Sequence, residues 1–271
     1  MTKHDSHAEA LQRDFPAAPL VPALDFARRG IPSHGHSAVD FEQRVNFDRL
    51  REYRISRAVE SLEASGCGAF LLFDFYNIRY TTQTWIGGAL GDKMSRYALL
   101  TRDRKPYLWD FGSAAKHHKL FAPWLEPERS MAGMLGLRGA IHPDVGLMRD
   151  AVTTIKGILT DAGVAEEPIG VDIVEPEFLF EMQRQGLKVV DIQQSMLDAR
   201  SIKSVDEIML LNQAASMVDG VYQDIVNVLQ PGIRENEIVA LASKRLYELG
   251  SEQVEAINAV SGERCNPHPH N

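Results

Sequence analysis

Apolar residues recur at helical spacing over residues 47–64, which predicts a helix that Gly66 is suited to end. The apolar run 68–73 is short and unbroken, which is typical of a strand covered on both faces. Two β-rich runs, 97–100 and 107–111, flank polar residues that favour a turn and predict a hairpin. The first part of the chain therefore mixes a helix with strands.

The pattern continues with alternating elements. In chain order it predicts a helix over 113–121, loop-like residues 122–143, a helix over 145–161, a strand over 169–173, a helix over 177–185 and a strand over 187–192. Helices and strands in this order indicate an α/β domain.

The pattern changes after residues 193–203, where we expect a boundary. Ser204 and Glu207 have the spacing of a capping box. They open a long helix to about residue 229, with one apolar face made of Ile208, Leu211, Ala215, Val218, Tyr222, Ile225 and Leu229. A second helix, 235–249, and a short strand from Ile257 to Val260 are expected to follow, as the start of an α+β domain.

Three segments are therefore expected. Residues 1–40 are rich in Pro, His, Ala and Ser and predict an extended arm, either partly docked on its own domain or wrapped around a neighbouring subunit. Residues 41–195 form the α/β domain. Residues 196–271 form the beginning of a second domain that the chain does not complete.

Composition and charge narrow the ligand class. The hydrophobic content of 44% and the charged content of 24% are those of a globular protein. The net charge of −8 gives no electrostatic footprint for nucleic acid, and the absence of long basic or apolar runs argues against membrane docking or spanning. We expect a small molecule or a partner subunit as the ligand.

Two cysteines, Cys67 and Cys265, lie far apart in the sequence and form no disulfide framework. This usage fits a reducing compartment. The first residues lack the apolar stretch of a signal peptide. We therefore expect a cytoplasmic protein.

The last residues place two histidines on a stiff loop. Pro267 and Pro269 fix the backbone around His268 and His270. Three interpretations are open: a metal ligand, a hydrogen-bond donor to a charged substrate, or a surface loop. His268 is preferred as the site histidine because prolines flank it on both sides.

The second candidate site is aromatic. Residues Phe73, Phe75, Tyr76, Tyr80 and Trp85 include ring faces that could shelter a sulfonium or quaternary ammonium ion, which has no N–H group to donate. The alternative is core packing, which we expect for Phe73 and Phe75. Substrate binding is assigned to Trp85 and Tyr80.

Asp92 and Lys93 follow a glycine-rich loop. Either they reach the site of a neighbouring subunit, which makes them substrate-binding candidates, or they form a solvated loop tip.

Four motifs occur in the order found in a known family. These are Asn77-Ile-Arg-Tyr80, Arg200-Ser-Ile-Lys-Ser-Val-Asp-Glu-Ile208, Pro231-Gly-Ile-Arg-Glu235 and Ser261-Gly-Glu263 followed by the histidine loop. The first is similar to a strand-edge motif of creatinase-type N-terminal domains. Together the motifs resemble the pita-bread metalloenzymes, which include creatinase, prolidase and aminopeptidase P-like proteins. The proline-rich histidine loop, Trp85 and the N-terminal arm resemble most closely the dimethylsulfoniopropionate lyases of that fold.

The resemblance implies a creatinase-like N-terminal domain, the start of a pita-bread catalytic domain, and a homodimer. It implies metal-dependent cleavage of dimethylsulfoniopropionate to dimethyl sulfide and acrylate, with iron, zinc or manganese held by ligands beyond residue 271. One of His268 and His270 would stabilise charge on the substrate. The chain of 271 residues is then expected to be inactive alone. The alternatives are an Xaa-Pro peptidase or creatinase-like hydrolase, and a metal-free binding relative.

Overall fold

The computed structural model describes residues 45–86, 96–134 and 142–266. Its first part contains a six-stranded mixed sheet in the order β4-β3-β2-β1-β5-β6. The strands are β1 (Ala69–Leu72), β2 (Tyr97–Thr101), β3 (Tyr107–Asp110), β4 (Ser130–Ala132), β5 (Ile169–Val171) and β6 (Val189–Asp191). The β1–β2 and β2–β3 pairs are antiparallel, whereas β3–β4, β1–β5 and β5–β6 are parallel.

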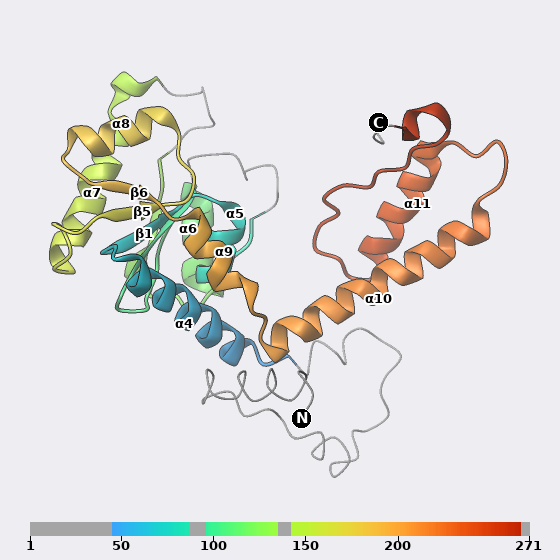
Figure 1. Cartoon of the computed structure of the whole chain (residues 1–271), viewed down its shortest axis with the longest axis horizontal. Helices are drawn as coiled ribbons and strands as arrows, with labels where there is room; N and C mark the ends of the chain where they lie inside the picture. Colours follow the sequence, from blue (N-terminus) through green and yellow to red (C-terminus); the bar gives the residue numbers. More distant parts are fainter. Residues whose placement is uncertain (1–44, 87–95, 135–141, 267–271) are drawn as a thin grey trace, which may run out of the picture.

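Helices cover both faces of this sheet (Figure 1). They are α4 (Phe47–Ser65), α5 (Phe75–Thr82), α6 (Gly112–Phe121), α7 (Leu147–Asp161), α8 (Pro176–Arg184) and α9 (Gln193–Ser201). The expectation of an α/β domain is therefore confirmed for this part of the chain.

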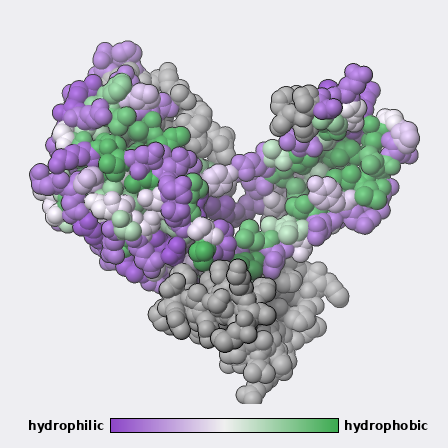
Figure 2. Space-filling model, in the orientation of Figure 1, coloured by the Kyte–Doolittle hydropathy of each residue, from purple (hydrophilic) through white to green (hydrophobic). Residues whose placement is uncertain are grey.

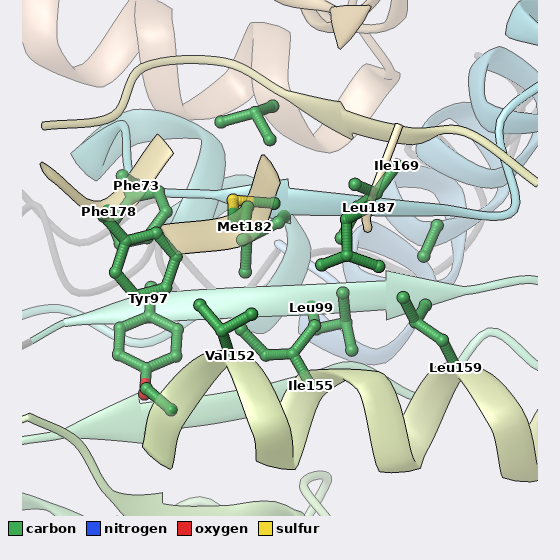
Figure 3. Packing of buried hydrophobic residues seen from close by; sticks show 14 of the residues in the cluster. Phe73, Tyr97, Leu99, Val152, Ile155, Leu159, Ile169, Phe178, Met182 and Leu187 are labelled. Atoms are coloured by element: carbon green, nitrogen blue, oxygen red, sulfur yellow. The ribbon is translucent and has the colours of Figure 1, made fainter. Parts of the chain in front are cut away.

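The strand β1 supplies side chains to both faces because successive residues of a strand point in opposite directions. Leu71 and Phe73, the residue directly after β1, pack with residues of α7 and α8 in one core. Figure 3 shows Phe73 in this core with Val152 and Phe178. Phe70 and Leu72 pack in a second core with residues of α4, α5 and α9. The prediction of a strand covered on both faces is confirmed.

Helix α4 shows why the sequence is helical here. The Asn46 side chain accepts a hydrogen bond from Arg49 N at 2.9 Å and caps the first turn, and Gly66 ends the helix with φ +73°. The buried side is apolar and includes Ile55 and Leu62. The predicted helix over residues 47–64 is thus confirmed to within one residue at its end.

Three elements of the first part differ from the predictions. Helix α9 occupies most of the segment 193–203, which was expected to be a boundary. Strand β4 lies within residues 122–143, which were expected to be loop-like, because it is only three residues long and is defined by its parallel partner β3. The segment Asn77–Tyr80, expected at a strand edge, lies in helix α5. The side chain of Asp74 caps that helix and stabilises the turn directly after β1.

The second part of the chain consists of α10 (Val205–Val228) and α11 (Glu235–Glu248), which pack on each other and extend away from the sheet (Figure 1). The capping box is confirmed: Ser204 Oγ accepts from Glu207 N at 3.2 Å, and Glu207 Oε2 accepts from Ser204 N at 2.9 Å. Beyond α11, residues 257–260 form no strand, so that prediction was wrong. A strand needs a neighbour for its backbone groups, and no strand of the described residues adjoins this segment.

The two parts are joined at the first turn of α10. Asp206 is fully buried and accepts two hydrogen bonds from the Arg49 guanidinium at 2.7 and 2.8 Å and one from Asn46 N at 3.0 Å. The hydrogen bond with Asp206 raises the pKa of Arg49. Glu207 pairs with Arg54 at 2.8 Å. We call these contacts the Arg49–Asp206 junction.

Much of the apolar face predicted for α10 is exposed, including Leu211, Val218 and Tyr222. Figure 2 shows hydrophobic residues gathered over α10 and α11. Within the described residues, no helix combines the length and apolar character needed to cross a bilayer.

Candidate functional site

The candidate site is built on the turn that follows β1. Asp172, next to the end of the parallel neighbour β5, accepts hydrogen bonds from Phe73 N at 2.8 Å, Asp74 N at 3.1 Å and Asn77 Nδ2 at 2.9 Å. Burial raises the pKa of the Asp172 carboxyl, and these hydrogen bonds oppose the increase. Asp74 accepts from Asn77 N at 2.9 Å. The carboxylates of Asp172 and Asp74 together fix the start of α5 at the end of the sheet.

Residues of helix α5 form an aromatic group with Trp85, which follows the helix. The ring of Phe75 lies edge-on to Trp85 with centroids 4.2 Å apart, and Tyr76 lies 6.4 Å from the same ring. The guanidinium of Arg79 lies over the Trp85 ring, 4.5 Å from its centroid. Phe75 and Arg79 are four residues apart and share one side of the helix. We call Phe75, Tyr76, Arg79 and Trp85 the Trp85 cluster.

A buried polar network supports the residue before Trp85. Arg96 Nη2 donates to Thr84 Oγ1 at 2.5 Å and to Thr84 O at 3.1 Å. Arg96 Nε lies 3.2 Å from Asp110 Oδ2, which also contacts His118 Nε2 at 3.0 Å. All four residues are buried. Burial lowers the pKa of the Arg96 guanidinium, and Asp110 opposes this change. The network fixes the backbone that carries Trp85.

The segment after α11 returns to the Trp85 cluster. Arg79 pairs with Glu252 at 2.6 Å, and Tyr76 Oη donates to Glu255 Oε1 at 2.6 Å. The hydrogen bond to Glu255 is the main reason that the pKa of Tyr76 is raised. These two contacts place the second part of the chain against α5.

Two of the family-like motifs contact each other. Glu235, at the end of the Pro231–Glu235 motif, accepts from both N and Oγ of Ser261 at 2.6 Å and pairs with Arg264. The Ser261 and Arg264 contacts lower the pKa of Glu235. Because Ser261 and Arg264 lead directly into the histidine loop, Glu235 anchors the base of that loop.

The structure separates the two aromatic substrate-binding candidates. Trp85 lies in the partly exposed cluster, whereas Tyr80 lies in the core beneath α4, where its hydroxyl donates to Ala199 O at 3.1 Å. Burial raises the pKa of Tyr80. Phe73 packs against Tyr97 and Phe178 as expected of a core residue. The Tyr80 hydroxyl therefore has a structural hydrogen bond within the core.

The remaining candidates lie outside the described residues. These are Asp92, Lys93, His268 and His270. Their predicted roles stay predictions, as does the arm over residues 1–40.

Sequence reasoning missed the charged members of the site. Arg79, Arg96, Glu252 and Glu255 carried no assignment, although the spacing of Phe75 and Arg79 after the capping residue Asp74 indicates a short helix with both on one side. The contacts from α5 to Glu252 and Glu255 span 173 and 179 residues, and no local pattern predicts them.

The resemblance to the metalloenzyme family implies a bound metal ion. Within residues 45–86, 96–134 and 142–266, no three His, Cys, Asp or Glu side chains are grouped as a metal site requires. The described residues therefore do not fit a metal centre.

A separate surface cavity of about 330 Å³ lies between α4, the end of α5 and the β2–β3 turn. Trp124 lines it, donates Nε1 to Thr82 O at 2.8 Å, and carries the Arg51 guanidinium 4.5 Å from its ring centroid. The indole N–H thereby satisfies a carbonyl at the end of α5, which is a structural role.

No family model matches the chain. It is 25% identical over 228 residues to the dimethylsulfoniopropionate lyase DddP of Roseobacter denitrificans, a match that covers 80% of this chain and 50% of that protein. The enzyme of the same name from Roseovarius nubinhibens is 23% identical over 233 residues, with coverage of 82% and 51%. The chain thus spans about half the length of the curated relatives it matches.

Solved structures show the same fold. The Xaa-Pro dipeptidase from Bacillus anthracis gives a TM-score of 0.55 at 14% identity, covering 74% of this chain and 50% of that chain. The prolidase from Pyrococcus furiosus gives 0.52 at 13% identity, with coverage of 73% and 54%. Together with the lyase relatives, these matches confirm the predicted resemblance to the pita-bread family of creatinases, prolidases and aminopeptidase P-like proteins. The proteins that the chain resembles are enzymes.

Proposed function

We propose that the protein acts as a lyase on dimethylsulfoniopropionate or on a closely related sulfonium compound, and that the Trp85 cluster binds the sulfonium group. The observation that carries the proposal is the guanidinium of Arg79 over the Trp85 ring at 4.5 Å, with Phe75 edge-on at 4.2 Å. This ring face already accepts a delocalised cation. The similarity to two lyases over four-fifths of the chain supports the same substrate class.

The reaction is a β-elimination. A base removes a proton from the carbon next to the carboxylate, the electron pair forms the C=C bond of acrylate, and the C–S bond breaks. The sulfur leaves with the bonding electrons as neutral dimethyl sulfide. We propose that the described residues contribute the binding of the sulfonium leaving group to this reaction.

The loss of charge at sulfur determines what the Trp85 cluster contributes. Its attraction to a cation is strongest for the intact substrate and weakens as neutral dimethyl sulfide forms. An interaction that favours the substrate over the transition state lowers KM without raising kcat. The role of Trp85 is therefore capture and orientation of the substrate.

Other residues position the Trp85 cluster or are proposed to act on the substrate. Arg96 and Asp172 fix the two chain segments that carry Trp85 and Phe75. Glu235 holds the base of the histidine loop. His268 is proposed to donate to the developing negative charge on the substrate, with His270 as the alternative. Asp92 and Lys93 are proposed to contact the substrate in the site of a neighbouring subunit.

The assay is headspace detection of dimethyl sulfide from the full-length, metal-loaded protein. Turnover is expected, and its complete absence would refute the lyase proposal. Trp85→Leu is expected to raise KM by about two- to tenfold, with a smaller change in kcat. The matched control is Trp124→Phe, because Trp124 lies in a separate cavity and should leave KM unchanged.

The alternative is a hydrolase of the same fold, acting on Xaa-Pro peptides or on creatine. The observation that favours it is again Arg79, because creatine carries the same guanidinium group that lies on Trp85. Proline release from Gly-Pro, or urea release from creatine, would identify this activity. Substrate binding by a metal-free protein would instead indicate a binding relative.

We also propose that the protein is a homodimer in the cytoplasm, as the resemblance implies. Light scattering of the full-length protein tests the oligomeric state. A monomer at micromolar concentration would contradict the dimer.

A further inference from the structure

The Arg79 guanidinium makes two contacts, one with the Trp85 ring and one with Glu252. Its guanidinium lies 4.5 Å from the centroid of the Trp85 ring, and Nη2 donates to Glu252 Oε2 at 2.6 Å. Both charged side chains are partly exposed, at 38% for Arg79 and 64% for Glu252. An exposed ion pair holds its partners only weakly, so the guanidinium is free to move without leaving a buried charge behind.

The ring of Phe75, which lies against Trp85, also has a guanidinium close to it. The Arg96 guanidinium lies 5.4 Å from the centroid of Phe75. Arg96 is 2% exposed and is held by Thr84 and Asp110, so it stays in place. Burial is the main reason that the pKa of Arg96 is lowered, and the nearby positive charge of Arg79 acts in the same direction. Of the two guanidinium groups, Arg79 is the one that can leave.

A second arginine–tryptophan pair in the chain serves as a comparison. Arg51 lies over Trp124 at the same distance of 4.5 Å. That pair is part of the fold, because Arg51 Nη1 donates to Gln83 Oε1 at 2.9 Å and Trp124 Nε1 donates to Thr82 O. These contacts close the end of α5. The Arg79–Trp85 pair instead joins two partly exposed side chains.

We propose that Arg79 is a built-in competitor that occupies the cation site of Trp85 in the unliganded protein, and that a sulfonium or quaternary ammonium ligand binds by displacing it. The inference rests on the proposed function of the Trp85 cluster. Two cations cannot share one ring face, because like charges repel at van der Waals contact. The displaced guanidinium keeps Glu252 as its counter-ion.

This arrangement determines which ligands bind. A ligand must interact with the ring more favourably than the guanidinium does. Ions that keep a tight hydration shell, such as a primary ammonium, lose more on leaving water than a methylated cation does. Displacement therefore selects for methylated onium groups over amines.

The test is isothermal titration of the purified protein with tetramethylammonium chloride, a permanent cation that has no carboxylate and does not react. Arg79→Met keeps the length of the side chain and removes its charge. We expect this variant to bind tetramethylammonium about two- to fivefold more tightly than wild type, the gain expected from one exposed cation–π contact. Arg51→Met is the matched control and should bind as wild type does.

Arg79→Lys separates loss of charge from loss of bulk. Lysine retains a cation that can reach the ring, so its affinity should stay within about twofold of wild type. A gain for lysine equal to that for methionine would overturn the proposal. So would an affinity of Arg79→Met equal to or below that of wild type.

The affinity of Trp85→Leu for tetramethylammonium, measured beside that of Arg79→Met, distinguishes this inference from the proposed function. If Trp85→Leu abolishes binding while Arg79→Met brings no gain, the ring binds the cation but Arg79 does not compete. If Trp85→Leu leaves binding unchanged, the cation does not bind on Trp85, and both the inference and the proposed sulfonium site are refuted. Circular dichroism of each variant confirms that it folds.

Discussion

The Arg49–Asp206 junction allows a quantitative test of how the two parts of the chain are joined. Asp206 is fully buried, and its carboxylate accepts three hydrogen bonds, two of them from Arg49. In Asp206→Asn, one oxygen becomes an NH₂ group that cannot accept. At least one donor of Arg49 or Asn46 then loses its partner.

The cost follows from the burial of both partners. Breaking a buried ion pair costs about 3–5 kcal/mol when the remaining charge stays buried. The Arg49 side chain is 27% exposed, so water recovers part of that loss. We therefore expect Asp206→Asn to lower the free energy of unfolding by about 2–3 kcal/mol, which corresponds to a fall in Tm of about 4–12 °C.

The assay is urea unfolding followed by far-ultraviolet circular dichroism. Asp48→Asn is the matched control, because Asp48 pairs with Arg51 on the same helix but its side chain is 90% exposed. That variant should change the free energy of unfolding by less than about 0.5 kcal/mol. Equal effects of the two substitutions would refute the conclusion that burial makes the junction strong.

Two further predictions concern the contact between the parts and the packing of the sheet. The Tyr76–Glu255 hydrogen bond raises the pKa of Tyr76 above its ordinary value of 10.0, so wild type should be more stable than Tyr76→Phe below that pH. In urea titrations this difference should disappear as the pH rises through the raised pKa, and a difference that persists would contradict the assignment. A Cβ at Gly170 would lie 2.5 Å from Ile192 Cγ2, so thermal unfolding should show that Gly170→Ala destabilises the protein by about 1–3 kcal/mol. The control Gly157→Ala, in helix α7 with open space around it, should stabilise by about 0.5–1 kcal/mol, and a loss for both alanines would refute the packing argument.

The sequence predicted the elements whose own residues carry the pattern. Helix α4 has apolar residues at regular spacing and a glycine at its end, and the capping box of α10 is complete within four residues. Helix α5 was missed because its eight residues are aromatic, β-branched or polar. It is stabilised by Asp172, which contacts the chain 99 residues away and has no local signature.

For the candidate site, the sequence indicated Trp85 but not its charged partners. Trp85 stood out because an indole in a loop rich in Thr and Gly is unusual, and the structure places it in a partly exposed cluster. The partners that give the cluster its charge come from elsewhere: Arg96 from the next strand region, and Glu252 from beyond α11. Pairing of this kind depends on the tertiary fold, which periodicity does not encode.

The contacts of α4 have a consequence for synthesis of the protein on the ribosome. Its Ser61 side chain donates to Ser195 O, and its cap residue Asn46 receives its partner Asp206 from 160 residues later. Helix α4 is therefore among the first described elements to leave the ribosome, whereas its partners Ser195 and Asp206 leave it much later. Until α9 has emerged, the side of α4 that packs on α9 has no partner, so we expect the nascent chain to be open to aggregation until this domain is nearly complete.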